Sequence, residues 1–321
     1  MREHIPLPIW ILTGPTASGK TNIALKIAED IGAEIVSADS MLVYRGMDIG
    51  TEKPSRAARS KIPHHLIDIV DPWEEYNVGR YVKDFEATVH SLRQKGVPCI
   101  VVGGTALYLK AIMDGLFEGP PADWEYRNAL RSIVREKGVV SLHKMLGEVD
   151  PEAANKLHCN DQKRIIRALE VARATGRGIS SFQTQFGRAN PNYDCRVVAV
   201  EYERGILYKR IESRVDGMLQ RGLVEEVRSL VNNPQGLSRQ ASQALGYKEI
   251  IDFLQGKYTL SEAADLVKLR TRRFAKRQMT WFRSFSNVHW IHPLEEDDTA
   301  LLAEKVSEHF TQREFSLEIP S

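Results

Sequence analysis

Residues 14–21 constrain the fold of this chain more than any other stretch, because they read Gly-Pro-Thr-Ala-Ser-Gly-Lys-Thr. This run fits the phosphate-loop pattern G-x-x-x-x-G-K-[ST] without a mismatch. The apolar run Ile9–Leu12 precedes it and has the length of a buried parallel strand. Apolar residues recur at helical spacing after it. Strand, glycine-rich loop and helix are therefore predicted in the order that the motif requires, and a chance glycine turn is the alternative.

This loop predicts a cradle for a chain of phosphates. Backbone N–H groups and the N-terminus of the following helix would bind phosphate oxygens. Lys20 is expected to reach the terminal phosphates, and the Thr21 hydroxyl is expected to ligate Mg²⁺. The candidate diphosphate-binding residues are Gly14, Pro15, Thr16, Ala17, Ser18, Gly19, Lys20 and Thr21. The pattern does not identify the molecule that carries the phosphates.

Composition narrows the class of protein. The 321 residues allow one large domain or two smaller ones, and apolar and charged fractions of 42% and 27% are ordinary for a globular enzyme. No apolar run reaches the roughly 20 residues that a membrane-spanning helix needs, and the N-terminus lacks a signal-peptide pattern. Three widely spaced cysteines predict neither a disulfide framework nor a zinc site. We therefore expect a cytoplasmic protein with no membrane partner.

Short apolar strands alternate with helical patterns in the first part of the chain, which predicts a parallel sheet with helices on both faces. With the phosphate loop, this pattern indicates an α/β, P-loop NTPase-like fold. The expected strands are Ile9–Leu12, Glu34–Ala38, Leu66–Val70, Pro98–Val102, Arg196–Tyr202 and Val288–Ile291. The expected flanking helices are Lys20–Ile31, Val78–Gln94, Thr105–Met113, Gly205–Gln220, Leu223–Val231, Gln240–Gln255, Leu260–Arg283 and about 298–310.

Residues 120–193 interrupt this alternation. Gly119-Pro120-Pro121 is a linker signal, and the helical stretches that follow it contain few β-branched runs. We therefore expect a discontinuous catalytic core, residues 1–119 and 194–321, and an all-helical insertion domain of residues 120–193. The last residues, from about Thr311, are expected to form a loose tail.

Candidate catalytic and phosphate-binding side chains follow the expected strands, at the edge of the sheet where such folds bind substrates. Asp39 comes after the second strand, where a carboxylate can accept the proton of an incoming nucleophile; alternatively, it caps the next turn. Thr105 follows two glycines and would hold a phosphate oxygen or cap a helix. Arg210 and Arg214 share a helix face, so one of them would neutralise a leaving phosphate, unless both are solvated surface arginines.

A basic segment lies near the C-terminus. Leu266–Leu294 contains no Asp or Glu but seven Lys and Arg residues. It includes Lys276–Arg283, in which basic residues are interleaved with Trp and Phe, as is typical of nucleic-acid surfaces. The alternative is an amphipathic helix with its aromatic residues in the core. We expect both, with the aromatic side chains mainly packed and the basic side facing RNA.

Five motifs occur in a combination that resembles one known family. They are the phosphate loop, the run Asp39–Thr51, Val102–Tyr108 (Val-Gly-Gly-Thr-Ala-Leu-Tyr), Leu245–Lys248 (Leu-Gly-Tyr-Lys) and Lys276–Arg283 (Lys-Arg-Gln-Met-Thr-Trp-Phe-Arg). Together they resemble the bacterial tRNA dimethylallyltransferases over about residues 9–291. The resemblance implies transfer of a dimethylallyl group from dimethylallyl diphosphate to N6 of adenosine 37, next to the anticodon, with release of diphosphate. It also implies Mg²⁺ as cofactor and the tRNA anticodon stem-loop as partner, and we expect a monomer.

The same resemblance implies roles for single residues. Asp39 would be the general base, Thr105 would contact the reacting centre, and Arg214 would meet the charge on the leaving diphosphate. The implied tRNA contacts are Asp39, Ser40, Met41, Leu42, Thr105, Arg127, Lys163, Arg167, Gln243, Gly246, Tyr247, Lys248, Lys276, Arg277, Gln278 and Arg283. This chain departs from the family at Lys163, where a Gln-x-x-x-Arg pattern often has its glutamine, and at Gln243 and Lys248, where arginine is common in some members.

Two other enzymes and one binding protein remain as alternatives. A P-loop kinase of a small molecule and a prenyltransferase that acts on free AMP both fit the loop, but neither needs a basic helix. The kinase hypothesis is also weakened because no expected strand of this chain ends in an aspartate followed by an acid, as a Walker B motif does. A nucleotide-dependent RNA-binding module fits the basic helix, but this hypothesis leaves Asp39 beside the loop without a role.

Overall fold

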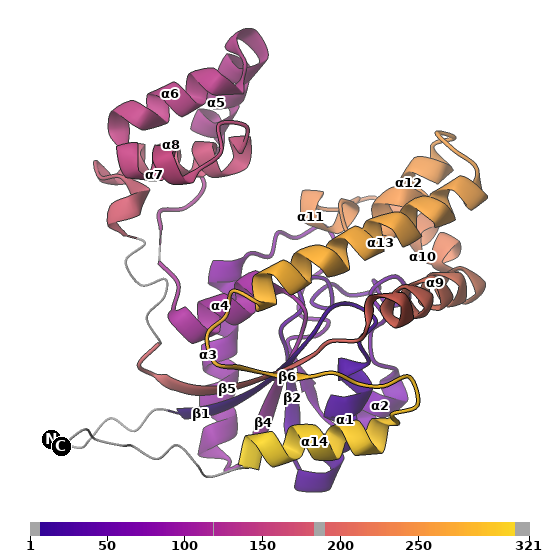
Figure 1. Cartoon of the computed structure of the whole chain (residues 1–321). Coiled ribbons are helices and arrows are strands. Elements are labelled where there is room, and N and C mark those ends of the chain that lie inside the picture. The colour runs from indigo at the N-terminus through magenta and orange to yellow at the C-terminus, as the bar shows by residue number, and fades with distance from the viewer. Residues whose placement is uncertain (1–6, 118, 183–189, 312–321) are drawn as a thin grey trace, which may run out of the picture. The chain divides into compact units, whose positions relative to one another are not determined.

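A computed structural model describes residues 7–117, 119–182 and 190–311 (Figure 1). The chain divides into two compact units. The sheet unit comprises Met1–Met113 and Pro191–Ser321, and the helical unit comprises Asp114–Asn190. No helix in the described ranges is both long and apolar enough to cross a membrane.

The sheet unit is built on a parallel sheet of six strands, in the order β3-β2-β4-β1-β5-β6. Strand β1 holds a central place because its apolar residues are buried on both faces, as parallel sheets require. The strands are β1 (Leu7–Thr13), β2 (Glu34–Ser37), β3 (His64–His65), β4 (Cys99–Val102), β5 (Tyr193–Val200) and β6 (Val288–Ile291).

Helices cover both faces of this sheet and form a separate hydrophobic cluster on each. Helices α1 (Lys20–Ile31) and α14 (Thr299–Thr311) pack on one face, where Ile27 and Val306 join the cluster. Helices α3 (Val78–Gln94) and α4 (Ala106–Asp114) pack on the other, where Phe85 and Leu109 are buried. Successive residues of a strand point to opposite faces, so β1 contributes to both clusters.

Five further helices follow β5 in the sheet unit. They are α9 (Arg204–Gln220), α10 (Leu223–Val231), α11 (Arg239–Ser242), α12 (Tyr247–Leu254) and α13 (Leu260–Phe282). Helix α13 packs against α9 and α12, and α10 also packs against α12 (Figure 1). The short helix α2 (Arg56–Lys61) precedes β3.

The helical unit has its own core. It contains α5 (Trp124–Lys137), α6 (Val139–Val149), α7 (Pro151–Lys156), α8 (Gln162–Thr175) and the 3₁₀ turn η1 (Ile179–Ser181). Leu130, Leu142 and Ile165 are among the buried side chains that hold α5, α6 and α8 together. The buried Asp150 caps α7 by accepting from Ala153 N at 3.0 Å.

Two of the predicted elements are wrong. Leu66–Val70 is not a strand, because Leu66 and Asp68 have φ angles of 60° and 56°, and the third strand is His64–His65 instead. Gln240–Gln255 is not one helix, because Gly246, with φ 88°, separates α11 from α12. The tail predicted beyond Thr311 lies outside the described residues.

Candidate active site

The loop between β1 and α1 has a backbone that requires glycine at two positions. Gly14 has φ 148°, and a Cβ there would lie 2.7 Å from Val200 O and 2.8 Å from Ser18 Oγ. Gly19 has φ 81° and directly precedes α1. The loop is therefore wrapped tightly against the end of β5, with the N-terminus of α1 at its end, which is the geometry of an anion cradle.

Lys20 places a buried amine in this cradle, where Nζ donates to Pro15 O at 3.3 Å. Burial and the nearby Arg214 outweigh the attraction of Asp39 and lower the pKa of Lys20 to about 8. An amine held in this way gains its full charge when an anion arrives. Lys20 is thus suited to bind a phosphate chain, as the sequence predicts.

Asp39 follows β2 and has one oxygen occupied. Its Oδ1 accepts from the backbone N–H of Met41 at 2.8 Å and of Leu42 at 3.4 Å. Within the described ranges no hydrogen bond reaches the other oxygen, Oδ2. The hydrogen bonds of Oδ1 fit the predicted capping role. The role as a base stays a prediction, for which Oδ2 is the available oxygen.

Thr105 ties the ends of β4 and β2 together beside Asp39. Its Oγ1 accepts from Ser40 N at 2.9 Å and donates to Ser40 Oγ at 3.3 Å. Gly103 makes this approach possible, because a Cβ there would lie 2.1 Å from Ala38 O. The Thr105 hydroxyl therefore holds the turn after Asp39, while the Thr105 carbonyl accepts from Leu109 N at 3.2 Å at the start of α4.

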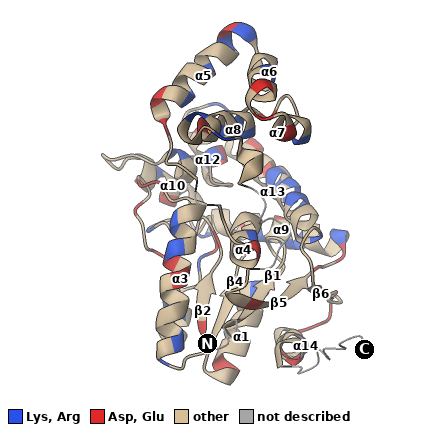
Figure 2. Cartoon of the chain, turned by 90° about the vertical axis from the view of Figure 1, so that its left-hand side faces the viewer, with Lys and Arg blue, Asp and Glu red and all other residues tan. Residues whose placement is uncertain are grey.

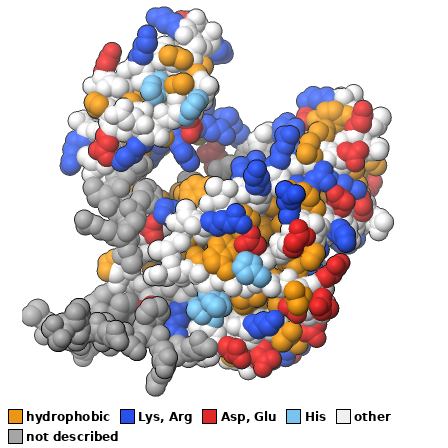
Figure 3. Space-filling model, in the orientation of Figure 1, with side chains coloured by type: hydrophobic (Ala, Val, Ile, Leu, Met, Phe, Trp, Pro, Cys, Tyr) orange, Lys and Arg blue, Asp and Glu red, His pale blue; other side chains and the backbone are white. Residues whose placement is uncertain are grey.

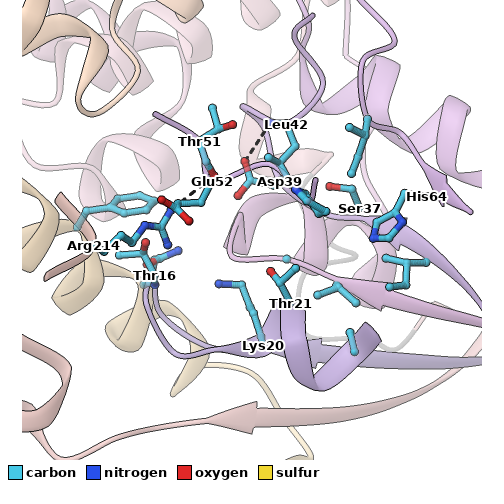
Figure 4. A pocket seen from close by; sticks show the side chains of 18 residues that line it. Thr16, Lys20, Thr21, Ser37, Asp39, Leu42, Thr51, Glu52, His64 and Arg214 are labelled. Atoms are coloured by element: carbon cyan, nitrogen blue, oxygen red, sulfur yellow. Dashed lines mark hydrogen bonds between the residues drawn. The ribbon is translucent and has the colours of Figure 1, made fainter. Parts of the chain in front are cut away.

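The two arginines that share a face of α9 do different things. Arg214 faces the site (Figure 4), and its Nη2 donates to Thr51 O at 3.5 Å; burial lowers its pKa from the ordinary value. Arg210 donates from Nε to Ala17 O at 2.8 Å, and its guanidinium lies 4.6 Å from the centre of the Tyr202 ring. Arg214 thus lies in the site, its action on a leaving group stays a prediction, and Arg210 braces the phosphate loop.

These side chains line two adjoining cavities that share a wall of Thr16, Asp39, Thr51, Arg214 and Phe274. The first, here called the loop cavity, has a volume of about 100 Å³ and also includes Lys20 and Thr21 (Figure 4). The second, here called the basic cavity, has a volume of about 560 Å³. Its further polar lining comprises Ser40, Thr105, Gln243, Lys248, Glu249, Arg270, Thr271, Arg273 and Arg277.

Basic residues gather on the part of the sheet unit that contains the second cavity. Figure 2 shows Lys and Arg along α13, and Figure 3 shows such side chains over the region where α13 lies in Figure 1. Arg277 lines the basic cavity, and Lys276 beside it is exposed. The aromatic Phe282 is fully buried, so α13 has a packed side and a basic side, and contact of the basic side with RNA stays a prediction.

Several residues that the resemblance assigns to tRNA contact have other partners. Tyr247 is fully buried, and its hydroxyl donates to Glu226 at 2.6 Å. Gln278 is also buried: it accepts from Thr16 N at 2.9 Å and donates to Gly104 O at 2.8 Å, so it links α13 to the phosphate loop. Both side chains are thus buried against protein partners, Gln278 also lines the loop cavity, and their contact with tRNA stays a prediction. Arg283 pairs with Glu201 at 2.5 Å and lines neither cavity.

In the helical unit the two candidate arginines share one acid. Arg127 pairs with Glu170 through two hydrogen bonds of 2.7 and 2.8 Å, and Arg167 reaches the same carboxylate at 2.5 Å. Burial alone would raise the pKa of Glu170, but these arginines hold it below its ordinary range. Lys163 is exposed.

The sequence reasoning missed several residues of the loop cavity. Thr51, Glu52 and Phe274 line it, although Thr51 is the last residue of a run that the resemblance singled out. His64 and Ser37 line it as well, and in the described part of the chain His64 Nε2 and Ser37 Oγ are buried without a hydrogen-bond partner. His64 Nδ1 lies 2.7 Å from Ile62 O and must be protonated to donate to that carbonyl oxygen, so Nε2 is the acceptor nitrogen when the ring is neutral.

A divalent cation would find few protein ligands here. No group of three or more His, Cys, Asp or Glu side chains in the described residues is arranged to hold a metal. Thr21, Asp39 and Glu52 nevertheless offer oxygen atoms along the loop cavity. This donor set fits Mg²⁺, which keeps several waters and binds through one or two protein oxygens together with substrate phosphates.

Comparison of the sequence with known proteins finds matches to two family models and to many relatives. A family model described as IPP transferase matches residues 42–285, and one described as isopentenyl transferase matches residues 7–68. The protein named tRNA dimethylallyltransferase 2 from Geotalea uraniireducens is 45% identical over 285 residues, which is 89% of this chain and 92% of that protein.

Solved structures agree. The tRNA isopentenylpyrophosphate transferase of Bacillus halodurans is 36% identical with a TM-score of 0.68, and the match covers 94% of this chain and 96% of that one. A eukaryotic dimethylallyltransferase acting on tRNA is 25% identical with a TM-score of 0.81, over 94% of this chain and 78% of that one.

Proposed function

This chain belongs to the IPP transferase family, and from that premise we propose that it transfers a dimethylallyl group from dimethylallyl diphosphate to N6 of adenosine 37, next to the anticodon of tRNA. One observation carries the mechanism: Asp39, whose Oδ2 has no hydrogen bond within the described residues, lines both the loop cavity and the basic cavity. A donor in the first cavity and an acceptor in the second would meet at that carboxylate.

The donor would bind by its diphosphate. Backbone N–H groups of residues 14–21 and the Lys20 amine would hold the phosphate oxygens. Thr21 would hold Mg²⁺, which, when bound, supplies a positive charge to the leaving oxygens. The Mg²⁺ site, the identity of the donor, the monomeric state and the cytoplasmic location are parts of this proposal.

The acceptor would enter the basic cavity. An adenine within a folded stem-loop must be splayed out before its exocyclic amine can reach a pocket. Arg273 and Arg277 line this cavity and would pair with phosphates of the RNA backbone. Lys276 extends the same basic surface. In the helical unit Lys163, Arg127 and Arg167 would add further contacts.

The transfer itself is a displacement at the allylic carbon. A bond forms between N6 and that carbon, the carbon–oxygen bond breaks, and diphosphate leaves with the bonding electrons. The proton of N6 passes to Oδ2 of Asp39, which Met41 and Leu42 keep in position through Oδ1. Lys20 and Arg214 meet the charge that grows on the diphosphate. Thr105 fixes the turn that carries Asp39.

The test is a label-transfer assay with purified protein. Labelled dimethylallyl diphosphate and Mg²⁺ are incubated with unmodified tRNA, with free AMP, or with a tRNA in which adenosine 37 is replaced. We expect label only in the unmodified tRNA. Label in AMP would favour the AMP-directed alternative, and binding of labelled ATP without any binding of the prenyl donor would favour the kinase.

A further inference from the structure

The segment Asp48–Lys53 lies along both cavities but has no regular secondary structure. Thr51 lines both cavities, and Glu52 lines the loop cavity. The carbonyl oxygen of Thr51 is also the acceptor of Arg214 Nη2, at 3.5 Å. The position of this segment therefore decides where the guanidinium of Arg214 stands relative to the phosphate loop.

A single carboxylate, that of Glu226 on α10, holds the first half of this segment. Its Oε2 accepts from Asp48 N at 3.0 Å and from Ile49 N at 2.7 Å, and its Oε1 accepts from Gly50 N at 3.2 Å. Three successive backbone N–H groups thus converge on one charged acceptor, and hydrogen bonds to charged groups are stronger than neutral ones.

Tyr247 completes the arrangement from α12. Its hydroxyl donates to Glu226 Oε1 at 2.6 Å, and burial together with the charge of Glu226 raises its pKa far above the ordinary value, so it stays a donor. The ring lies close to Gly50, where a Cβ would be 2.5 Å from Tyr247 Cε2. Gly246 and Lys248, on either side of Tyr247, line the basic cavity.

We infer that Glu226 is a positioning residue for the prenyl transfer, which it supports by fixing Asp48–Thr51 and, through the Thr51 carbonyl, the guanidinium of Arg214. The inference rests on the proposed function. Glu226 lines neither cavity, so its effect on the reaction would pass through the segment that it holds.

Other contacts keep both ends of the segment, Asp48 and Lys53, attached when Glu226 is changed. The nearly buried Lys53 pairs with Asp48 and with Asp68, both at 2.6 Å, and donates to Tyr44 O at 2.7 Å. Glu52 pairs with Arg221. Loss of the Glu226 carboxylate should therefore loosen Asp48–Gly50 without unfolding the sheet unit.

The experiment compares Glu226→Gln with Glu225→Gln, the same change one residue earlier on α10, where the side chain is exposed and pairs with Arg228 at 3.7 Å. Turnover with saturating donor and tRNA, tRNA affinity, and hydrogen exchange of the amides of residues 48–50 are measured. A small misplacement of a catalytic group can cost about 10²-fold. We expect Glu226→Gln to lower turnover by about 10- to 100-fold, to speed exchange of these amides and to leave tRNA affinity unchanged.

Tyr247→Phe removes only one of the four donors to Glu226 and should give a smaller effect in the same direction, so it serves as the test variant if Glu226→Gln does not fold. The inference is overturned if the variants keep wild-type turnover, or if they lose turnover while amides 48–50 exchange at the wild-type rate. A wild-type protein that never labels tRNA counts against the proposed function instead, and the exchange data then still decide whether Glu226 holds the segment.

Discussion

Replacement of Asp39 by asparagine separates the two roles of this carboxylate. Asparagine keeps Oδ1 as an acceptor for the N–H groups of Met41 and Leu42, so the turn after β2 should hold its shape. Its amide group cannot take up the N6 proton. Alanine would be a poorer probe, because each lost hydrogen bond to the carboxylate is worth about 1.5–3 kcal/mol and the turn itself would be disturbed.

The expected loss of turnover is about 10²–10⁴-fold, the range for removal of a general base. It corresponds to about 2.7–5.4 kcal/mol of transition-state stabilisation, at about 1.36 kcal/mol for each factor of ten. Single-turnover label transfer to tRNA measures the chemical step, while binding of tRNA and donor to Asp39→Asn should stay within about twofold of wild type.

The matched control is Asp30→Asn, on the exposed face of α1, where Asp30 pairs only with Lys26 at 2.6 Å in the described residues. It should keep wild-type turnover. If Asp39→Asn folds, binds both substrates and still turns over at the wild-type rate, then Asp39 is not the base and the reasoning from its open oxygen fails.

Two other predictions concern the charged groups of the site. Since the pKa of Lys20 is lowered to about 8, its amine is charged below that pH, and affinity for free diphosphate without Mg²⁺ should fall as pH rises through 8; calorimetric titration measures this, and a Lys20→Gln variant that shows the same fall would contradict it. The pair Lys276→Ala and Arg277→Ala should weaken tRNA binding and make the slope of log affinity against log salt shallower by about 0.7–0.9 for each lost phosphate contact. The control Lys26→Ala should leave that slope unchanged, and an unchanged slope in the double variant would exclude these contacts.

The sequence predicts those parts of the fold that depend on local pattern. Val78–Gln94 and Leu223–Val231 are helices with the predicted bounds, and Asn77 caps the first by accepting from Arg80 N. The prediction of a strand at Leu66–Val70 is wrong. Its apolar residues are buried within an irregular segment that contains left-handed residues, and apolarity alone does not distinguish such a segment from a strand.

In the candidate site, too, the sequence predicts what depends on local pattern and on the order of the strands, but not the contacts between distant segments. Asp39, Thr105 and the phosphate loop come together because parallel strands end at one edge of the sheet, which the sequence order already implies. Contacts between distant segments leave no such signal. Gln278 and Thr16 are 262 residues apart, and Glu226 reaches the amides of residues 48–50 from another helix. Only the folded chain reveals that these side chains position the site.

The separate cores of the two units bear on how the protein loses its structure when heated. Among the described residues, the cluster around Leu142 draws only on the helical unit, and the clusters around Phe85 and Ile27 draw only on the sheet unit. Burial of apolar surface is the main source of cooperativity, so melting of one unit need not remove the core of the other. A single melting temperature would then describe neither unit, and a calorimetric scan would have to be resolved into two transitions before any substitution could be assigned a cost.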